Sequence, residues 1–215
     1  MEHKPKYSGS NTMNENQFVS KLSNYMPMAA CAIAHKWVTD YPVNIKISKP
    51  RRTKLGDFRP KALGNGHAQI SVNGDLNPYS FLITFTHEIA HLIDYTKRKS
   101  LKEPHGDSWK IEYQHLLVEL LIAEVFPFDI RSDIISHINR PKAASCSDPR
   151  LLKALRIYDT ESHVTLNDIP VGAQFSTSLN RKFIKGELRR TRYRCKEVST
   201  GRFYLIHGES KIDLI

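Results

Sequence analysis

The chain has little cysteine and no long apolar run. Its 215 residues include three cysteines, Cys31, Cys146 and Cys195, which are far apart and odd in number. They exclude a disulfide framework and a four-cysteine zinc ribbon, and they indicate a reducing compartment. No run of 18 apolar residues occurs, and the polar N-terminus lacks a signal-peptide segment, so we expect no membrane partner. We therefore expect a cytoplasmic protein that is nucleoid-associated, or nuclear in a eukaryote.

Acidic residues are fewer than basic ones. The chain has 22 Asp and Glu against 32 Lys and Arg, a formal net charge of +10. This excess favours an anionic partner such as nucleic acid, although a basic protein without such a partner is the alternative. A hydrophobic content of 40% is sufficient for one sizeable core and a small second unit.

The most informative motif is HEIAH at residues 87–91. It lies in a mostly apolar segment, and no glycine or proline occurs from residue 79 to residue 103, which predicts a buried helix. Positions i and i+4 lie one turn apart on the same helix face, so His87 and His91 can bind one metal ion. Glu88 can then reach a metal-bound water as general base, so the motif predicts a catalytic zinc site.

A catalytic zinc ion needs a third protein ligand and an open position for water. The next histidine is His105, in the sequence HGDSW. Gly106 permits a tight turn there, and Asp107 or Ser108 can cap a second helix over about 107–125. His105 is therefore expected on the loop that enters the second helix, where it can turn back onto the first.

Three other side chains are candidates for this site. Asp94 and Asp107 can orient the histidines as hydrogen-bond partners, or they can be a solvated helix residue and a helix cap. His67, on a predicted strand, can approach the metal or simply pack. The sequence leaves these alternatives open.

The residues THEIAH and HGDSW resemble the SprT-like metalloproteases, which include the Spartan proteases. That family has HExxH on a long helix, then a third His more than ten residues later, followed by Gly and a nearby Trp. The segment KLGDFRPKALGNGHAQISVNGDLNP is similar to the family's hairpin, which delivers a strand just before the helix. The resemblance covers roughly residues 15–125. The metzincin pattern HExxHxxGxxH fails, because Asp94 and Lys97 occupy its Gly and His positions.

This resemblance implies a zincin-like domain with one zinc ion, held by His87, His91 and His105, and Glu88 as the base. Together with three short predicted strands at 43–47, 55–59 and 67–72, it predicts an α+β fold. The family often carries a zinc ribbon near its C-terminus, but the partners of Cys195 are absent. We predict a flexible tail (1–13), a SprT-like metalloprotease domain (14–140), a linker with a short helix (141–160) and a small basic β unit of four or five strands (161–215).

The segment RKFIKGELRRTRYRCK at residues 181–196 is dense in positive charge. If 188–196 is one strand, alternate arginines project from one face at about 7 Å, close to the spacing of phosphates. Phe183 and Tyr193 could stack on unpaired bases, or they could belong to the core. No base-reading motif occurs, so binding to DNA would not be sequence-specific. The candidate nucleic-acid-binding residues are Arg181, Lys182, Lys185, Arg189, Arg190, Arg192, Arg194 and Lys196.

The leading hypothesis is a zinc-dependent endopeptidase. By the resemblance, its protein substrate is bound or crosslinked to DNA, which would connect it with DNA–protein crosslink repair. One alternative is a non-enzymatic nucleic-acid-binding protein with a structural zinc site. Another is a metallopeptidase acting on ordinary cytoplasmic proteins. Glu88 favours an enzyme, because a structural site has no use for a base. The sequence does not indicate an oligomeric state.

Overall fold

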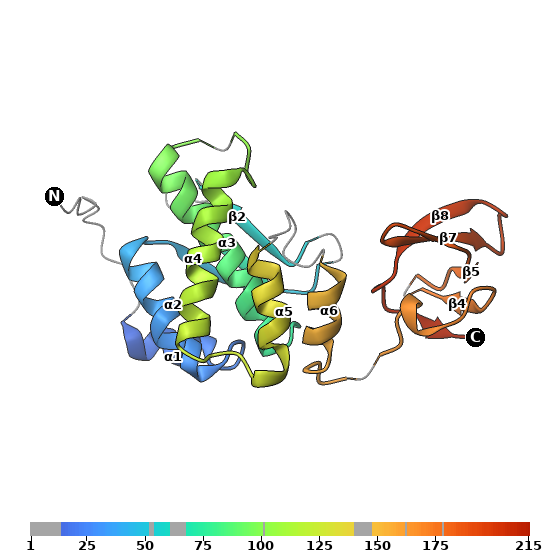
Figure 1. Ribbon diagram of the computed structural model, residues 1–215, viewed down its shortest axis with the longest axis horizontal. Coiled ribbons are helices and arrows are strands. Elements are labelled where there is room, and N and C mark those ends of the chain that lie inside the picture. The colour runs from blue at the N-terminus through green and yellow to red at the C-terminus, as the bar shows by residue number, and fades with distance from the viewer. Residues whose placement is uncertain are drawn as a thin grey trace. The chain divides into compact units, whose positions relative to one another are not determined.

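The computed structural model describes residues 14–51, 54–60, 68–100, 102–139, 148–161, 163–177 and 179–215. The expected tail over 1–13 and the positions of His67 and Cys146 lie outside these residues. The described residues form an α+β fold in two compact units, one within residues 1–145 and one within 146–215 (Figure 1).

The described residues of the first unit form five helices. The predicted helical segment 14–39 is divided at Pro27, which precedes the second helix and provides no backbone N–H for a continuous one. Among the described residues, no helix has both the length and the apolar character needed to cross a membrane. The five helices are α1 (Glu15–Leu22), α2 (Met28–Asp40), α3 (Pro78–Arg98), α4 (Asp107–Ile122) and α5 (Phe128–Asn139).

Helix α3 is the centre of the first unit, and α4 packs along it (Figure 1). The Asn77 side chain caps α3 by accepting hydrogen bonds from the backbone N–H groups of Tyr79 and Ser80, and Pro78 occupies the first turn. From Ser80 to Asp94, every residue except His91 is buried. The HEIAH motif therefore lies on a helix that the surrounding core holds firmly.

A three-stranded sheet completes this unit. It consists of β1 (Asn44–Ser48), β2 (Gly56–Arg59) and β3 (Gln69–Asn73), in the order β1-β3-β2. Strand β1 is parallel to β3 and β2 is antiparallel to it, which confirms the expected pairing of β2 with the strand that precedes α3. Strand β2 is an edge strand of the described sheet, and it lies against α3.

The second unit is a small β module preceded by a helix. Its core contains the side chains of Leu166, Phe175, Phe183, Cys195 and Ile212. Its elements are α6 (Pro149–Arg156), the 3-10 helix η1 (Leu166–Asp168), and strands β4 (Gln174–Ser176), β5 (Lys182–Ile184), β6 (Leu188–Arg189), β7 (Arg192–Glu197), β8 (Phe203–His207) and β9 (Asp213–Leu214).

Two strand predictions for this unit are wrong. Its described residues form six strands rather than four or five. The segment 188–196 is not a single strand but a tight hairpin of β6 and β7. The chain reverses at Arg190 and Thr191, and Arg190 adopts the left-handed conformation, with φ of 61°. Arg190 therefore lies in the turn, while Arg192 and Arg194 lie on β7.

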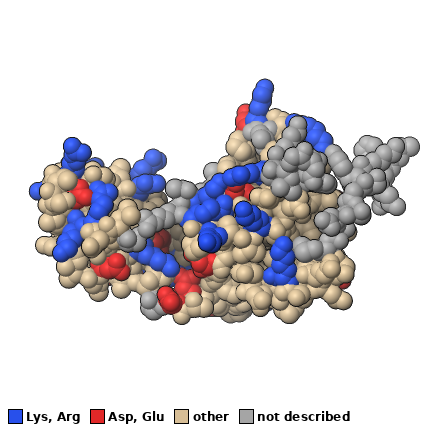
Figure 2. Space-filling view, turned by 180° about the vertical axis from the view of Figure 1, so that it is seen from behind, with Lys and Arg blue, Asp and Glu red and all other residues tan. Residues whose placement is uncertain are grey.

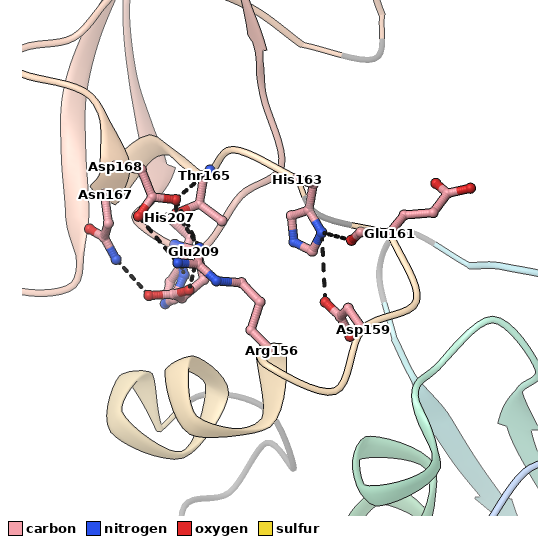
Figure 3. A network of polar contacts seen from close by, with 9 residues as sticks. All are labelled: Arg156, Asp159, Glu161, His163, Thr165, Asn167, Asp168, His207 and Glu209. Carbon is pink, nitrogen blue, oxygen red and sulfur yellow. Dashed lines mark hydrogen bonds and ion pairs between the residues drawn. The ribbon is translucent and has the colours of Figure 1, made fainter.

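A polar network attaches the end of α6 to the β module (Figure 3). The Arg156 guanidinium donates hydrogen bonds to Thr165 Oγ1 at 2.7 Å and to Asp168 Oδ2 at 2.9 Å. The pKa of Asp168 is well below its ordinary value, mainly because of the hydrogen bond from Arg156. Glu209 joins the network through its ion pair with Arg156 Nη1 at 3.7 Å, and it also accepts a hydrogen bond from Asn167 Nδ2 at 2.6 Å.

Candidate metal centre

Three histidines converge on one point. The Nε2 atom of His91 lies 3.1 Å from those of both His87 and His105, and the other two are 3.3 Å apart. His87 and His91 come from adjacent turns of α3, and His105 comes from the connection between α3 and α4. They are the three residues of the described chain that are placed to hold a metal ion together.

Burial keeps these imidazoles neutral. It is the main reason that the pKa of His87 lies far below its ordinary value and that the pKa of His91 falls to about 3, and it also lowers the pKa of His105. The neighbouring rings add to the effect on His87 and His91. Neutral imidazole is the form that binds a metal ion, so the site is set for ligation over the whole physiological pH range.

An aromatic wall supports the three rings. The Trp109 ring, fully buried in α4, lies 4.6 Å from the His87 ring, 5.2 Å from His91 and 4.8 Å from His105, between ring centroids. Tyr113, one turn further along α4, stacks on Trp109 at 5.0 Å. The motif HGDSW suggested a nearby Trp, but not that its ring contacts all three ligands.

Glu88 is buried between α3 and β2. Its side chain accepts a hydrogen bond from the backbone N–H of Phe58. Burial, followed by the nearby charge of Asp57, raises the pKa of Glu88 to about 8, while Arg51 and Lys54 act in the opposite direction. The carboxyl group is therefore held in one place by the first unit, and without a nearby cation it keeps its proton up to about neutral pH.

Strand β2 covers this side of the site. A Cβ atom added at Gly56 would lie 2.4 Å from Glu88 Oε1, so only glycine leaves room for the carboxylate. The Phe58 ring lies nearly parallel to that of His91, with centroids 6.5 Å apart. Sequence reasoning missed both residues, because the contact between β2 and α3 is made by tertiary packing.

The two aspartates proposed as partners of the histidines have different positions. Asp107 is exposed and pairs with Lys110 at 2.8 Å, and the cap of α4 is Gly106 rather than Asp107. Asp94 is buried and is therefore not a solvated helix residue. Its carboxylate pairs with the guanidinium of Arg98.

The candidate nucleic-acid-binding residues do not form one surface. Lys185 is buried, with its Nζ donating to the backbone carbonyl of Ile169 at 2.6 Å, so it cannot contact a phosphate in this conformation. Arg181 is half-buried and pairs with Glu197 at 2.6 Å. The exposed members are Lys182, Arg189, Arg190, Arg192, Arg194 and Lys196.

The predicted aromatic partners also differ. Phe183 is in the core, and the Tyr193 ring is covered by Lys185 Nζ at 3.9 Å. Strand β8 supplies an exposed aromatic residue instead. Phe203 pairs in register with Lys196, and the guanidinium of Arg194 lies 3.8 Å from the centre of its ring.

Comparison of the chain with known protein families, with curated proteins and with solved structures finds no match. The resemblance to SprT-like proteases therefore rests on the sequence motifs alone. Function has to be argued from the site itself.

Proposed function

We propose that this protein is a zinc-dependent endopeptidase. The observation that carries the proposal is the convergence of three Nε2 atoms within 3.1–3.3 Å of one another, next to a buried Glu88. A tetrahedral zinc ion with Zn–N bonds of about 2.0–2.1 Å requires ligand nitrogens roughly 3.3–3.4 Å apart.

The donor set supports this fit. Each Nε2 atom carries either one proton or one lone pair, so three mutually adjacent Nε2 atoms cannot all form hydrogen bonds with each other. One shared cation would satisfy all three. Three imidazoles leave a fourth position for a reactant, and zinc accepts nitrogen ligands readily.

Glu88 is the residue proposed to move protons. A zinc ion in this site would supply Lewis acidity, which activates water and polarises a peptide carbonyl. The Glu88 carboxylate takes the proton from the attacking water and passes it to the leaving amine. The hydrogen bond from Phe58 and the close approach of Gly56 fix the carboxylate, so that it does not have to be ordered in each catalytic cycle.

Strand β2 is the proposed docking edge for the substrate. It is an edge strand of the described sheet and flanks both Glu88 and His91. An extended peptide can add to such an edge through backbone hydrogen bonds, which recognise a chain irrespective of its sequence. This arrangement suits an unfolded or extended protein segment as substrate.

The test of the enzyme proposal combines metal analysis with digestion of casein or histone. Purified protein should contain about one zinc ion per chain, and His87→Ala, His91→Ala or His105→Ala should each lose most of it. Glu88→Gln should retain zinc and lose activity by two or more orders of magnitude. A wild-type protein that holds zinc but cleaves nothing would favour the alternative of a structural metal site.

The proposed substrates are proteins bound or crosslinked to nucleic acid. Figure 2 shows Lys and Arg side chains spread over both units on the face that it presents, with fewer Asp and Glu among them. On β7, Arg192, Arg194 and Lys196 are exposed at alternate positions, which places them on one face of the strand at about 7 Å intervals. Phe203 adds an exposed ring beside them, on which a base can stack.

Salt-dependent binding of oligonucleotides tests this partner. Replacing Arg192, Arg194 and Lys196 together by Ala should flatten the log–log slope of affinity against salt by about two or three, since each phosphate contact contributes about 0.7–0.9. The control replaces three exposed lysines elsewhere, Lys36, Lys46 and Lys153, and changes the net charge equally. Equal slopes for the two variants would reduce the β7 face to an ordinary solvated surface.

A further inference from the structure

Of the three candidate ligands, His105 is the one that does not lie in a helix or strand. His87 and His91 belong to a buried helix, whereas His105 lies in the connection from Lys99 to Gly106. Lys99 and Glu103 in that connection both have φ of 54°, a left-handed conformation that costs energy for residues other than glycine. Contacts with the rest of the unit must therefore hold the connection in its path.

Asp94 and Arg98 provide such contacts. Asp94 lies one turn after His91, on the same helix, and is 4% exposed. Its carboxylate accepts two hydrogen bonds from the Arg98 guanidinium, one of them at 2.7 Å from Nε. Arg98 Nη1 in turn donates to the backbone carbonyl of Lys102, three residues before His105, at 3.2 Å.

The same carboxylate also reaches the far side of His105. Asp94 is hydrogen-bonded to the side chain of Ser108, in the first turn of α4. One buried carboxylate thus binds the chain on both sides of His105, through Arg98 and Lys102 before it and through Ser108 after it. A contact of this kind restricts the ligand without touching the metal.

We propose that Asp94, Arg98 and Ser108 form a latch that positions His105, so that Asp94 sets the affinity of the metal centre. The proposal rests on the proposed zinc site. Asp94 is a positioning residue in it, since its carboxylate hydrogen-bonds to groups on both sides of the ligand. Loss of the latch is expected to weaken zinc binding about 10- to 100-fold, the usual effect of removing an outer partner of a ligand.

The experiment measures zinc dissociation constants by competition with a chromophoric chelator, and the visible spectrum of the Co2+ form. Asp94→Asn keeps the shape of the side chain but weakens its hydrogen bonds to Arg98. Ser108→Ala removes one contact and leaves every charge in place. Both should raise the zinc dissociation constant, with Asp94→Asn the stronger of the two, and both should alter the Co2+ spectrum, which reports ligand geometry.

The control is a second link between the same two helices. Lys97 Nζ pairs with Glu112 Oε1 at 2.6 Å, which also joins α3 to α4 but lies outside the latch. Glu112→Gln should change zinc affinity by no more than about threefold. It should leave the Co2+ spectrum unchanged, whatever its effect on stability.

The outcomes separate this inference from the proposed function. A wild-type protein that binds no zinc would overturn the metal centre as a whole. Wild-type zinc binding with unchanged affinity and spectrum in Asp94→Asn and Ser108→Ala would overturn only the latch. If Asp94→Asn does not fold in the presence of EDTA, Ser108→Ala and Arg98→Lys decide the question by the same two measurements.

Discussion

Removing the Glu88 carboxyl should change how the stability of the metal-free protein depends on pH. Folding raises the pKa of this group from an ordinary 4.5 to about 8, first through burial and then through Asp57. Between those two values the folded chain holds the Glu88 proton and the unfolded chain does not. The free energy of unfolding must therefore fall as the pH rises through this window.

The magnitude follows from the width of the window. Each pH unit within the window lowers the free energy of unfolding by about 1.4 kcal/mol. The total loss therefore reaches at most about 5 kcal/mol above pH 8. Glu88→Gln has nearly the same shape and can still accept the hydrogen bond from Phe58, but it does not titrate. In EDTA the variant should match the wild type near pH 4.5 and be more stable by several kcal/mol at pH 8.5.

Urea unfolding of both proteins from pH 4.5 to 9, followed by circular dichroism, measures this difference directly. The site histidines also make stability depend on pH in this range, because burial lowers their pKa values and they take up protons in the unfolded chain first. Both proteins contain them, so their contribution cancels in the comparison. Parallel stability curves for the two proteins would refute the argument. They would mean that the carboxyl is solvated in the metal-free protein, and that it is not held against β2 as described.

Three further substitutions test other contacts. Gly56→Ala should lower peptidase activity by about one to three orders of magnitude with zinc retained, because the added Cβ displaces Glu88; Gly74→Ala, where the Cβ meets Ile47 at 2.7 Å, should lower stability but not activity per folded molecule. Arg156→Met should destabilise the second unit by about 1 kcal/mol at neutral pH, a partly exposed pair being worth no more. Because the pKa of Asp168 is depressed in the folded chain, this stabilisation is present above its ordinary value of 3.8 and is lost as the pH falls, so wild type and variant should converge in acid.

The sequence predicted the part of the site that local geometry controls. His87, Glu88 and His91 are fixed by helical spacing, so a pattern of five residues was enough to place them together. His105 was identified because a histidine followed by glycine can turn back to the helix, and the structure brings it to the other two. The contributions of Gly56 and Phe58 could not be found in this way, since nothing in a short strand about 30 residues upstream shows which helix it will cover.

For the basic segment at residues 181–196, the sequence did not predict which side chains share a surface. A single strand over 188–196 would place alternate arginines on one face, but the segment is a hairpin with Arg190 in its turn, and successive residues of a strand point to opposite faces. Lys185 extends into the interior, where the backbone carbonyl of Ile169 and the Tyr193 ring interact with its ammonium group. These contacts offset the free-energy cost of burying the charge. Phe203 was overlooked because its position next to Lys196 depends on the register of β7 and β8, which sequence spacing did not reveal. Strand register, rather than composition, decides which cations can meet a ligand.

The three candidate metal ligands come from two kinds of structure, a packed helix and a short connecting segment. His87 and His91 stand on one helix against the buried Trp109 ring, so their positions are set when the chain folds and little ordering would be left for a metal ion to impose. His105 stands in a short connection whose backbone includes two left-handed residues. In the proposed zinc site, the free energy needed to order His105 is then the contribution to metal affinity that nearby substitutions can change. Asp94 stands on α3 beside His91, whose pKa its charge raises against the larger effect of burial, and its hydrogen bonds reach the chain on both sides of His105. Ser108→Ala leaves the charge beside His91 in place, so an effect of that variant on zinc affinity would come from the position of His105.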